Sequence, residues 1–76
     1  MKAMVEVIAK TLVDDPEGVE VREVEEGGDS ILELTVAQPD LGKVIGKQGR
    51  TAGAMRTLLA ATGAKANKHF VLEILE

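Results

Sequence analysis

A seven-residue stretch, VIGKQGR at positions 44–50, contains the residues of this chain whose types and spacing could do chemistry. Gly46 and Gly49 are separated by one lysine and one glutamine, and Arg50 follows directly. Glycine inside a helix costs about 0.5–1 kcal/mol relative to alanine, so two glycines here indicate a loop between helices. A bare backbone beside Lys47 and Arg50, ahead of the free N–H groups of a helix start, is suited to bind phosphate. The stretch therefore predicts a site where a chain of phosphates runs along the loop and the bases lie in a groove beside it.

Other phosphate-binding motifs do not match this spacing. A Walker loop has four residues between its glycines and a Ser or Thr after its lysine. Gly42 and Gly46 have three residues between them, and Lys47 is followed by Gln48. The dinucleotide fingerprint needs three glycines and a strand that enters the loop, and neither is present. The alternative without a ligand is a tight turn between two helices.

Residues that could support catalysis are scarce. The chain has no cysteine, which excludes a thiolate nucleophile, a disulfide and a cysteine zinc site. His69 is the only histidine and lies in an apolar run, so we interpret it as an ordinary strand residue. No pair of carboxylates has a spacing suited to acid and base chemistry, because the acidic residues cluster in turns and in a hairpin. We therefore predict a protein that is not an enzyme and that uses no metal or cofactor.

The length and the charge distribution of the chain limit the class of protein that it can be. Seventy-six residues make a single domain, 1–76, with a small core. The sequence has no signal peptide and no long apolar run, so we expect a cytoplasmic protein without membrane contact. The net charge is −4, but positions 11–40 carry ten acidic residues against one arginine, whereas positions 41–72 carry six basic residues and no acid. This separation predicts a positive surface at one end of an acidic protein.

The hydrophobic pattern predicts the elements that precede the loop. Residues 1–13 have the apolar stripe of an amphipathic helix. A Gly-Gly turn then joins a strand at 19–26 to a second strand at 31–37. The first strand loses its alternation at Val24, where we expect a bulge or a frayed end. Asp40 is the predicted N-cap of the short helix that leads into the loop.

A further helix and a strand follow the loop. Met55, Leu58, Leu59 and Thr62 recur at helical spacing and form the predicted buried face of this helix, and Gly63 is its predicted end. The closing run KHFVLEIL is typical of a strand. The opposite side of the helix carries small residues that would let another backbone approach, so we expect a subunit contact there. These residues are Gly53, Thr57, Ala60 and Ala61.

The stretch VIGKQGRTAGAMRTLL resembles the signature of the KH domain, in which a GXXG loop joins two helices and holds about four nucleotides. LVDDPEGVEV, the hairpin and the closing LEIL are similar to small bacterial single-KH RNA-binding proteins of the KhpA type, so the resemblance covers nearly the whole chain. It implies an α+β fold, the type II (prokaryotic) KH domain of order α-β-β-α-α-β, with a three-stranded sheet and helices packed on one face. It also implies a non-catalytic RNA-binding protein that acts as an RNA chaperone or post-transcriptional regulator.

The resemblance also implies site residues and partners. The apolar pair Val44 and Ile45 would form the floor of a groove for single-stranded RNA. Phe70 is the only aromatic residue, so base stacking contributes little. The family implies a homodimer and pairing with a larger KH-containing protein; the alternative function is a protein-interaction module that dimerises instead of binding RNA. The predicted RNA-binding residues are Lys43, Val44, Ile45, Gly46, Lys47, Gln48, Gly49, Arg50 and Thr51.

Overall fold

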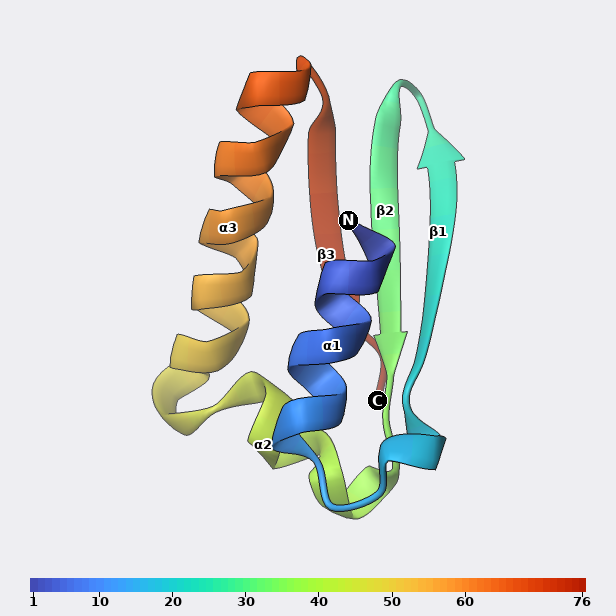
Figure 1. Cartoon of the computed structure of the whole chain (residues 1–76), viewed down its shortest axis with the longest axis vertical. Coiled ribbons are helices and arrows are strands. Elements are labelled where there is room, and N and C mark those ends of the chain that lie inside the picture. The colour runs from blue at the N-terminus through green and yellow to red at the C-terminus, as the bar shows by residue number, and fades with distance from the viewer.

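The computed structural model describes residues 1–76 and contains three helices and three strands (Figure 1). The order along the chain is α-β-β-α-α-β, as predicted, with short 3₁₀ turns before β1, before α2 and between α2 and α3. The elements are α1 Lys2–Leu12, β1 Glu20–Glu26, β2 Asp29–Thr35, α2 Leu41–Ile45, α3 Arg50–Ala66 and β3 His69–Ile74. None of the helices combines the length and the apolar character needed to cross a bilayer.

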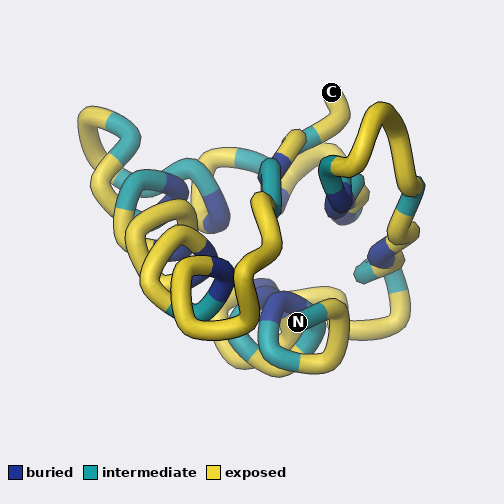
Figure 2. The backbone as a smooth tube through the Cα atoms, turned by 90° about the horizontal axis from the view of Figure 1, so that it is seen from above, coloured by how far each residue is buried: buried dark blue, intermediate teal, exposed yellow.

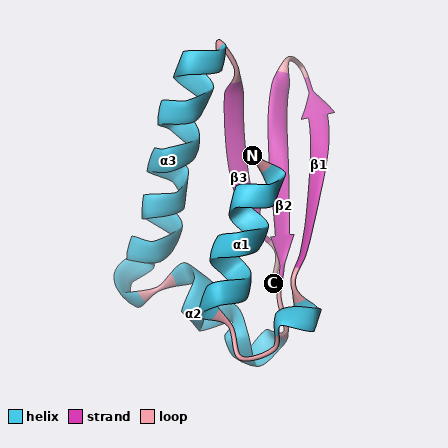
Figure 3. Ribbon diagram, in the orientation of Figure 1, coloured by secondary structure: helices cyan, strands magenta, loops and turns pink.

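The strands form one mixed sheet in the order β1-β2-β3. β1 and β2 are antiparallel neighbours, whereas β2 and β3 are parallel because α2, the loop and α3 carry the chain back to the other end of the sheet. Both α1 and α3 lie over the same face of the sheet, and the other face stays open (Figures 1 and 3). The prediction of a three-stranded sheet with helices on one face is therefore confirmed.

The hairpin between β1 and β2 has no bulge. Gly27 and Gly28 form its two-residue turn with φ of 59° and 88°, angles that glycine adopts without strain. The pairing runs without interruption from Glu20 opposite Thr35 to Glu26 opposite Asp29. The predicted bulge or frayed end at Val24 is therefore wrong. Val24 pairs with Ile31, and both side chains lie on the open face of the sheet, which explains the lost alternation without an extra residue.

The core lies between the sheet and the helices (Figure 2). Leu32 and Leu34 of β2 are fully buried at its centre, and Val36 continues their predicted alternation with 9% exposure. On the helix side, Val5 and Ala9 supply the buried face of α1. The remaining buried members of this cluster are Val13, Val21, Val44, Met55, Leu59 and Leu72.

The buried face of α3 is rotated from the predicted one. Met55 and Leu59 are buried as expected, but Leu58 is 48% exposed, and Ala52 and Gly63 complete the inner face instead. The reason lies at Gly63, where an added Cβ would collide with the carbonyl oxygen of the chain that returns from α3 to β3. Only glycine allows this close approach, so it fixes which side of α3 faces the sheet.

The end of α3 also differs from the prediction. Gly63 lies inside the helix, which continues to Ala66 and ends at Asn67 in the left-handed conformation with φ of 57°. The amide N–H of Lys68 donates to the carbonyl oxygen of Gly63 at 2.8 Å, and that of Asn67 donates to Ala64 at 3.4 Å. This is the bonding of a Schellman motif, in which Asn takes the place that glycine most often fills.

Candidate nucleic-acid interface

The loop between α2 and α3 consists of three positive-φ residues around one lysine. Gly46 ends α2 with φ of 78°, and Gln48 and Gly49 follow with φ of 58° and 73°. α3 then begins at Arg50 in regular helical geometry. A left-handed conformation at Gln48 is uncommon for a residue with a side chain, so the loop is a defined structure of high curvature between two helices.

The two glycines of the loop share left-handed angles but differ in what surrounds them. A Cβ on Gly46 would collide with the Thr51 side chain and would lie 2.8 Å from the Thr51 backbone nitrogen. Gly46 is therefore required by the turn itself. A Cβ on Gly49 would meet nothing within 4 Å, so its bare backbone faces open space. The φ of 73° also favours glycine at position 49, so the turn accounts for both glycines, and the open space beside Gly49 leaves its backbone accessible to a ligand.

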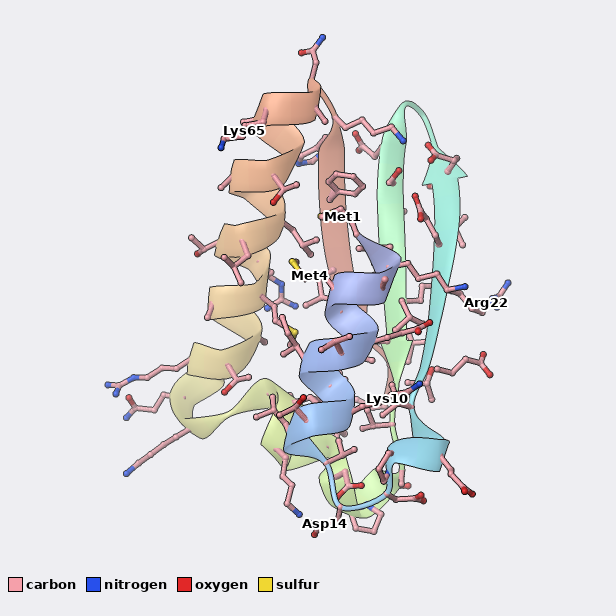
Figure 4. The ribbon with its side chains drawn as sticks, in the orientation of Figure 1. Met1, Met4, Lys10, Asp14, Arg22 and Lys65 are labelled. Carbon is pink, nitrogen blue, oxygen red and sulfur yellow. The ribbon has the colours of Figure 1, made fainter.

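Two cations flank this accessible backbone. Lys47 and Arg50 are both exposed, and neither takes part in a salt bridge. The Arg50 guanidinium donates through Nη2 to Oε1 of the exposed Gln48 at 3.2 Å. In Figure 4 the long side chains of this loop extend away from the rest of the molecule. The loop thus presents two uncompensated positive charges beside open backbone.

Lys43 differs from these two cations although the sequence groups it with them. Its ammonium lies 2.8 Å from Oδ2 of Asp14 and 3.4 Å from Oδ1 of Asp40. The hydrogen bonds to Asp14 and Asp40 raise the pKa of Lys43 above its ordinary value, against the opposing effect of desolvation. These carboxylates therefore favour the charged form of Lys43 and also compensate its charge.

Asp40 occupies the predicted N-cap position of α2, but its side chain has a different role. It stands at the N-cap position of α2 but makes no side-chain cap bond, and its side chain is buried with 2% residue exposure. Its two carboxylate oxygens accept the backbone N–H groups of Asp14 at 3.2 Å and Asp15 at 3.1 Å instead. Desolvation opposes ionisation, but these bonds and Lys43 outweigh it and lower the pKa of Asp40. The partners are 25 and 26 residues away in the chain, so no local pattern indicated them.

The apolar residues predicted as a groove floor are divided by the fold. Val44 is fully buried in the core, so it supports the loop from beneath and cannot touch a ligand. Ile45 is half-buried and keeps an accessible edge, and Thr51 is half-buried against Gly46. The structure has one pocket, of about 340 Å³, in which Leu41 is the contribution of α2. Its lining residues are Thr35, Val36, Gln38, Leu41, Leu75 and Glu76.

The basic residues after the loop do not form one continuous positive patch. Arg56 donates to the backbone carbonyl oxygen of Leu72 at 3.3 Å, at the outer edge of β3. Lys68 lies 3.7 Å from Glu25 at the far end of the molecule. The positive end predicted from positions 41–72 is thus limited to the loop.

The outer face of α3 is composed of small residues around one leucine. Thr57, Ala60 and Ala61 are exposed, and Gly53 is half-buried. Successive residues of a helix are about 100° apart around its axis. Relative to the observed buried face of α3, Ala61 therefore lies on the opposite side and Ala60 lies on one flank. The half-exposed Leu58 lies on the other flank, so this face offers an apolar side chain next to a flat surface.

No cluster of three or more His, Asp or Glu side chains is arranged to hold a metal ion. His69 opens β3 as a strand residue, and its Nδ1 lies 3.0 Å from Oδ1 of Asp29 directly across the sheet. The arrangement that remains at the loop is one of backbone and cations, which suits binding of a polyanion rather than chemistry on it.

The order α-β-β-α-α-β, the mixed sheet and the GXXG loop between two helices define a small KH domain of the prokaryotic arrangement. The comparison with known families agrees: the model of the KhpA/KhpB KH domain matches residues 2–74. The chain belongs to this family.

Curated relatives cover the whole chain. The chain is 56% identical over 75 residues to the RNA-binding protein KhpA of Clostridium perfringens, which is 99% of this chain and 100% of that protein. It is 53% identical over 76 residues to the RNA-binding protein KhpA of Aquifex aeolicus, at 100% and 96% coverage. No solved structure matches the chain.

Proposed function

We propose that this protein binds single-stranded RNA through the loop from Gly46 to Gly49. The observation that carries the proposal is the open backbone at Gly49 between two uncompensated cations, Lys47 and Arg50, in a domain of the KH family. A phosphate chain that passes over Gly49 meets no Cβ and is attracted from both sides. The names of the relatives, which are RNA-binding proteins, support the same ligand.

The charge distribution orients such a ligand. The open face of the sheet carries acidic side chains in register across the strands, with Arg22 as the only arginine or lysine among them. This face repels a polyanion, so the RNA approaches from the loop. The acidic residues that lie there are Glu20, Glu26, Asp29, Glu33 and Glu73.

The proposed function is binding without catalysis, and an RNA ligand supports a location in the cytoplasm. The loop offers two cations and has no aromatic residue beside it for base stacking. It is therefore expected to bind the sugar-phosphate backbone and to discriminate weakly between bases. Such a protein suits the role of an RNA chaperone or post-transcriptional regulator. The purified protein is expected to leave nucleotides and RNA uncleaved.

The outer face of α3 is the second functional surface of the proposal. Its small residues and the half-exposed Leu58 support a contact with a second copy, or with a larger KH-containing protein that presents a similar face. The alternative function is a docking module without RNA binding. It would use this surface, and the loop would bind no ligand.

Salt dependence separates the two functions. The experiment measures binding of a fluorescent single-stranded oligoribonucleotide by anisotropy over a series of salt concentrations. Two phosphate contacts predict a slope of log K against log salt of about −1.4, because each contact on a single strand contributes about −0.7. A slope near zero, or no binding at low salt, would reject the RNA-binding proposal in favour of docking.

A further inference from the structure

The cations next to the loop are not equivalent, because only one of them is held by acids. Lys43 stands on α2, one turn before the loop, with its ammonium 2.8 Å from the Asp14 carboxylate. Asp14 belongs to the turn after α1, far from α2 in sequence but beside it in space (Figure 4). Lys47 and Arg50 have no such partner.

We propose that Asp14 keeps the Lys43 ammonium out of the path of the RNA phosphates and thereby sets the number of cations that bind the strand. This inference rests on the proposed RNA-binding function and adds to it a residue that determines affinity. With the ion pair closed, the RNA meets two cations at the loop. With the pair absent, the flexible four-carbon stem of Lys43 can bring a third cation to the strand where it leaves the loop along α2.

Asp14, rather than Asp40, is the residue on which this restraint depends. Asp40 already accepts two backbone N–H groups and lies farther from Lys43, at 3.4 Å. The Asp14 side chain is 82% exposed, and Lys43 is the only partner that the structure gives it. Replacing the Asp14 carboxylate therefore removes the shorter of the two ion pairs of Lys43 and leaves only the longer one, to Asp40. Asp40 itself is not disturbed, since the bond from Asp14 to Asp40 comes from the backbone N–H and survives.

The exposure of the pair explains why it can restrain Lys43 without locking it. The Lys43 side chain is 43% exposed and its Asp14 partner more so. Ion pairs in such surroundings are weak and are screened by salt. The loss of one exposed carboxylate is therefore expected to change the fold little, while the intact pair keeps the Lys43 charge compensated when the loop binds RNA.

The test compares D14N with E17Q in the salt series described above. Both substitutions remove one negative charge from the same turn, but Glu17 takes part in no salt bridge, so E17Q controls for net charge. We expect D14N to steepen the slope by about 0.7, which is one additional phosphate contact, and to raise affinity by up to about eightfold at about 0.05 M salt. E17Q should leave the slope unchanged.

Lys43 itself supplies the second arm. K43Q alone should leave the wild-type slope unchanged, because the charge that it removes is already compensated. In the D14N background, K43Q should abolish the gain. The K43Q single variant does not depend on how well D14N folds, and circular dichroism and thermal melting monitor the fold of each variant.

The outcomes are distinct. Equal slopes for D14N and E17Q would overturn the proposal, and so would a slope that K43Q alone flattens by about 0.7, since Lys43 would then already contact phosphate. In both cases RNA binding by the loop would stand. Failure of the wild type and of D14N to bind RNA would overturn the loop function and this inference together.

Discussion

Reversing the charge of the loop provides the most direct test of how it binds RNA. The double variant K47D/Q48D replaces one positive and one neutral side chain by two carboxylates. Both positions are exposed, and position 48 has left-handed angles that aspartate tolerates better than most residues with a side chain. In the wild type the Arg50 guanidinium donates to Gln48, so a carboxylate at 48 lies close to that cation and compensates part of its charge.

The magnitude follows from the charges. The Coulomb interaction energy between one unit charge and a phosphate about 5 Å away in water is about 0.8 kcal/mol. The variant changes the loop by three units, which gives about 2.5 kcal/mol before screening. With a Debye length of about 8 Å at physiological salt, about half of this remains, or about 1.3 kcal/mol. RNA affinity should therefore fall about tenfold. Exposed substitutions shift stability by about 0.5 kcal/mol, so the fold should survive.

A matched control lies at the opposite end of α3. Lys65, which is labelled in Figure 4, is exposed and forms no salt bridge. Asn67 is also exposed and has left-handed angles like those of Gln48. K65D/N67D therefore makes the same change in charge and also places one aspartate at a left-handed position, away from the loop. The assay is anisotropy of a labelled oligoribonucleotide, with melting curves for both variants. Binding that persists in a well-folded K47D/Q48D, or that falls equally in the control, would refute the loop as the phosphate site.

Three further predictions concern stability and assembly. G53A should raise the unfolding free energy by about 0.5–1 kcal/mol, because its Cβ would lie in open space on a helix. G63A should lower it by about 1–3 kcal/mol, because its Cβ would collide with the chain that returns from α3 to β3. Denaturant titration of both variants measures the difference. The Asp40 pKa is lowered by folding, so its stabilisation is complete above the unfolded pKa of about 3.9 and is lost as the pH falls through the lower folded value; acid unfolding of D40N should lack this part of the pH dependence. A61Y should give a folded monomer in light scattering if α3 is the subunit contact, and an unchanged dimer mass would remove Ala61 from that interface.

The sequence by itself determined the elements and the loop. The alternation of Leu32 and Leu34 placed β2, and the Gly-Gly turn placed the hairpin, because both signals depend on neighbours within a few residues. The spacing of Gly46 and Gly49 identified the loop and its family for the same reason. Local backbone preference and hydrophobic periodicity are properties that a chain carries without its fold.

Tertiary structure decided which side chains are free to act. Lys43 and Lys47 are alike in sequence, but the turn after α1 brings Asp14 to Lys43 and leaves Lys47 without a partner. Gly46 and Gly49 are also alike in sequence, but the Thr51 side chain fills the space beside the first and nothing fills the space beside the second.

The face of α3 shows the same division. Periodicity correctly predicted a helix with Met55 and Leu59 inside, since both residues belong to the predicted and to the observed buried face. The exact rotation was set by the contact between Gly63 and the chain that enters β3, which turns Leu58 outward. Such contacts join residues through the packing of separate elements. A pattern read along one helix therefore indicates which elements form, and the packed structure alone fixes which of their surfaces remain accessible.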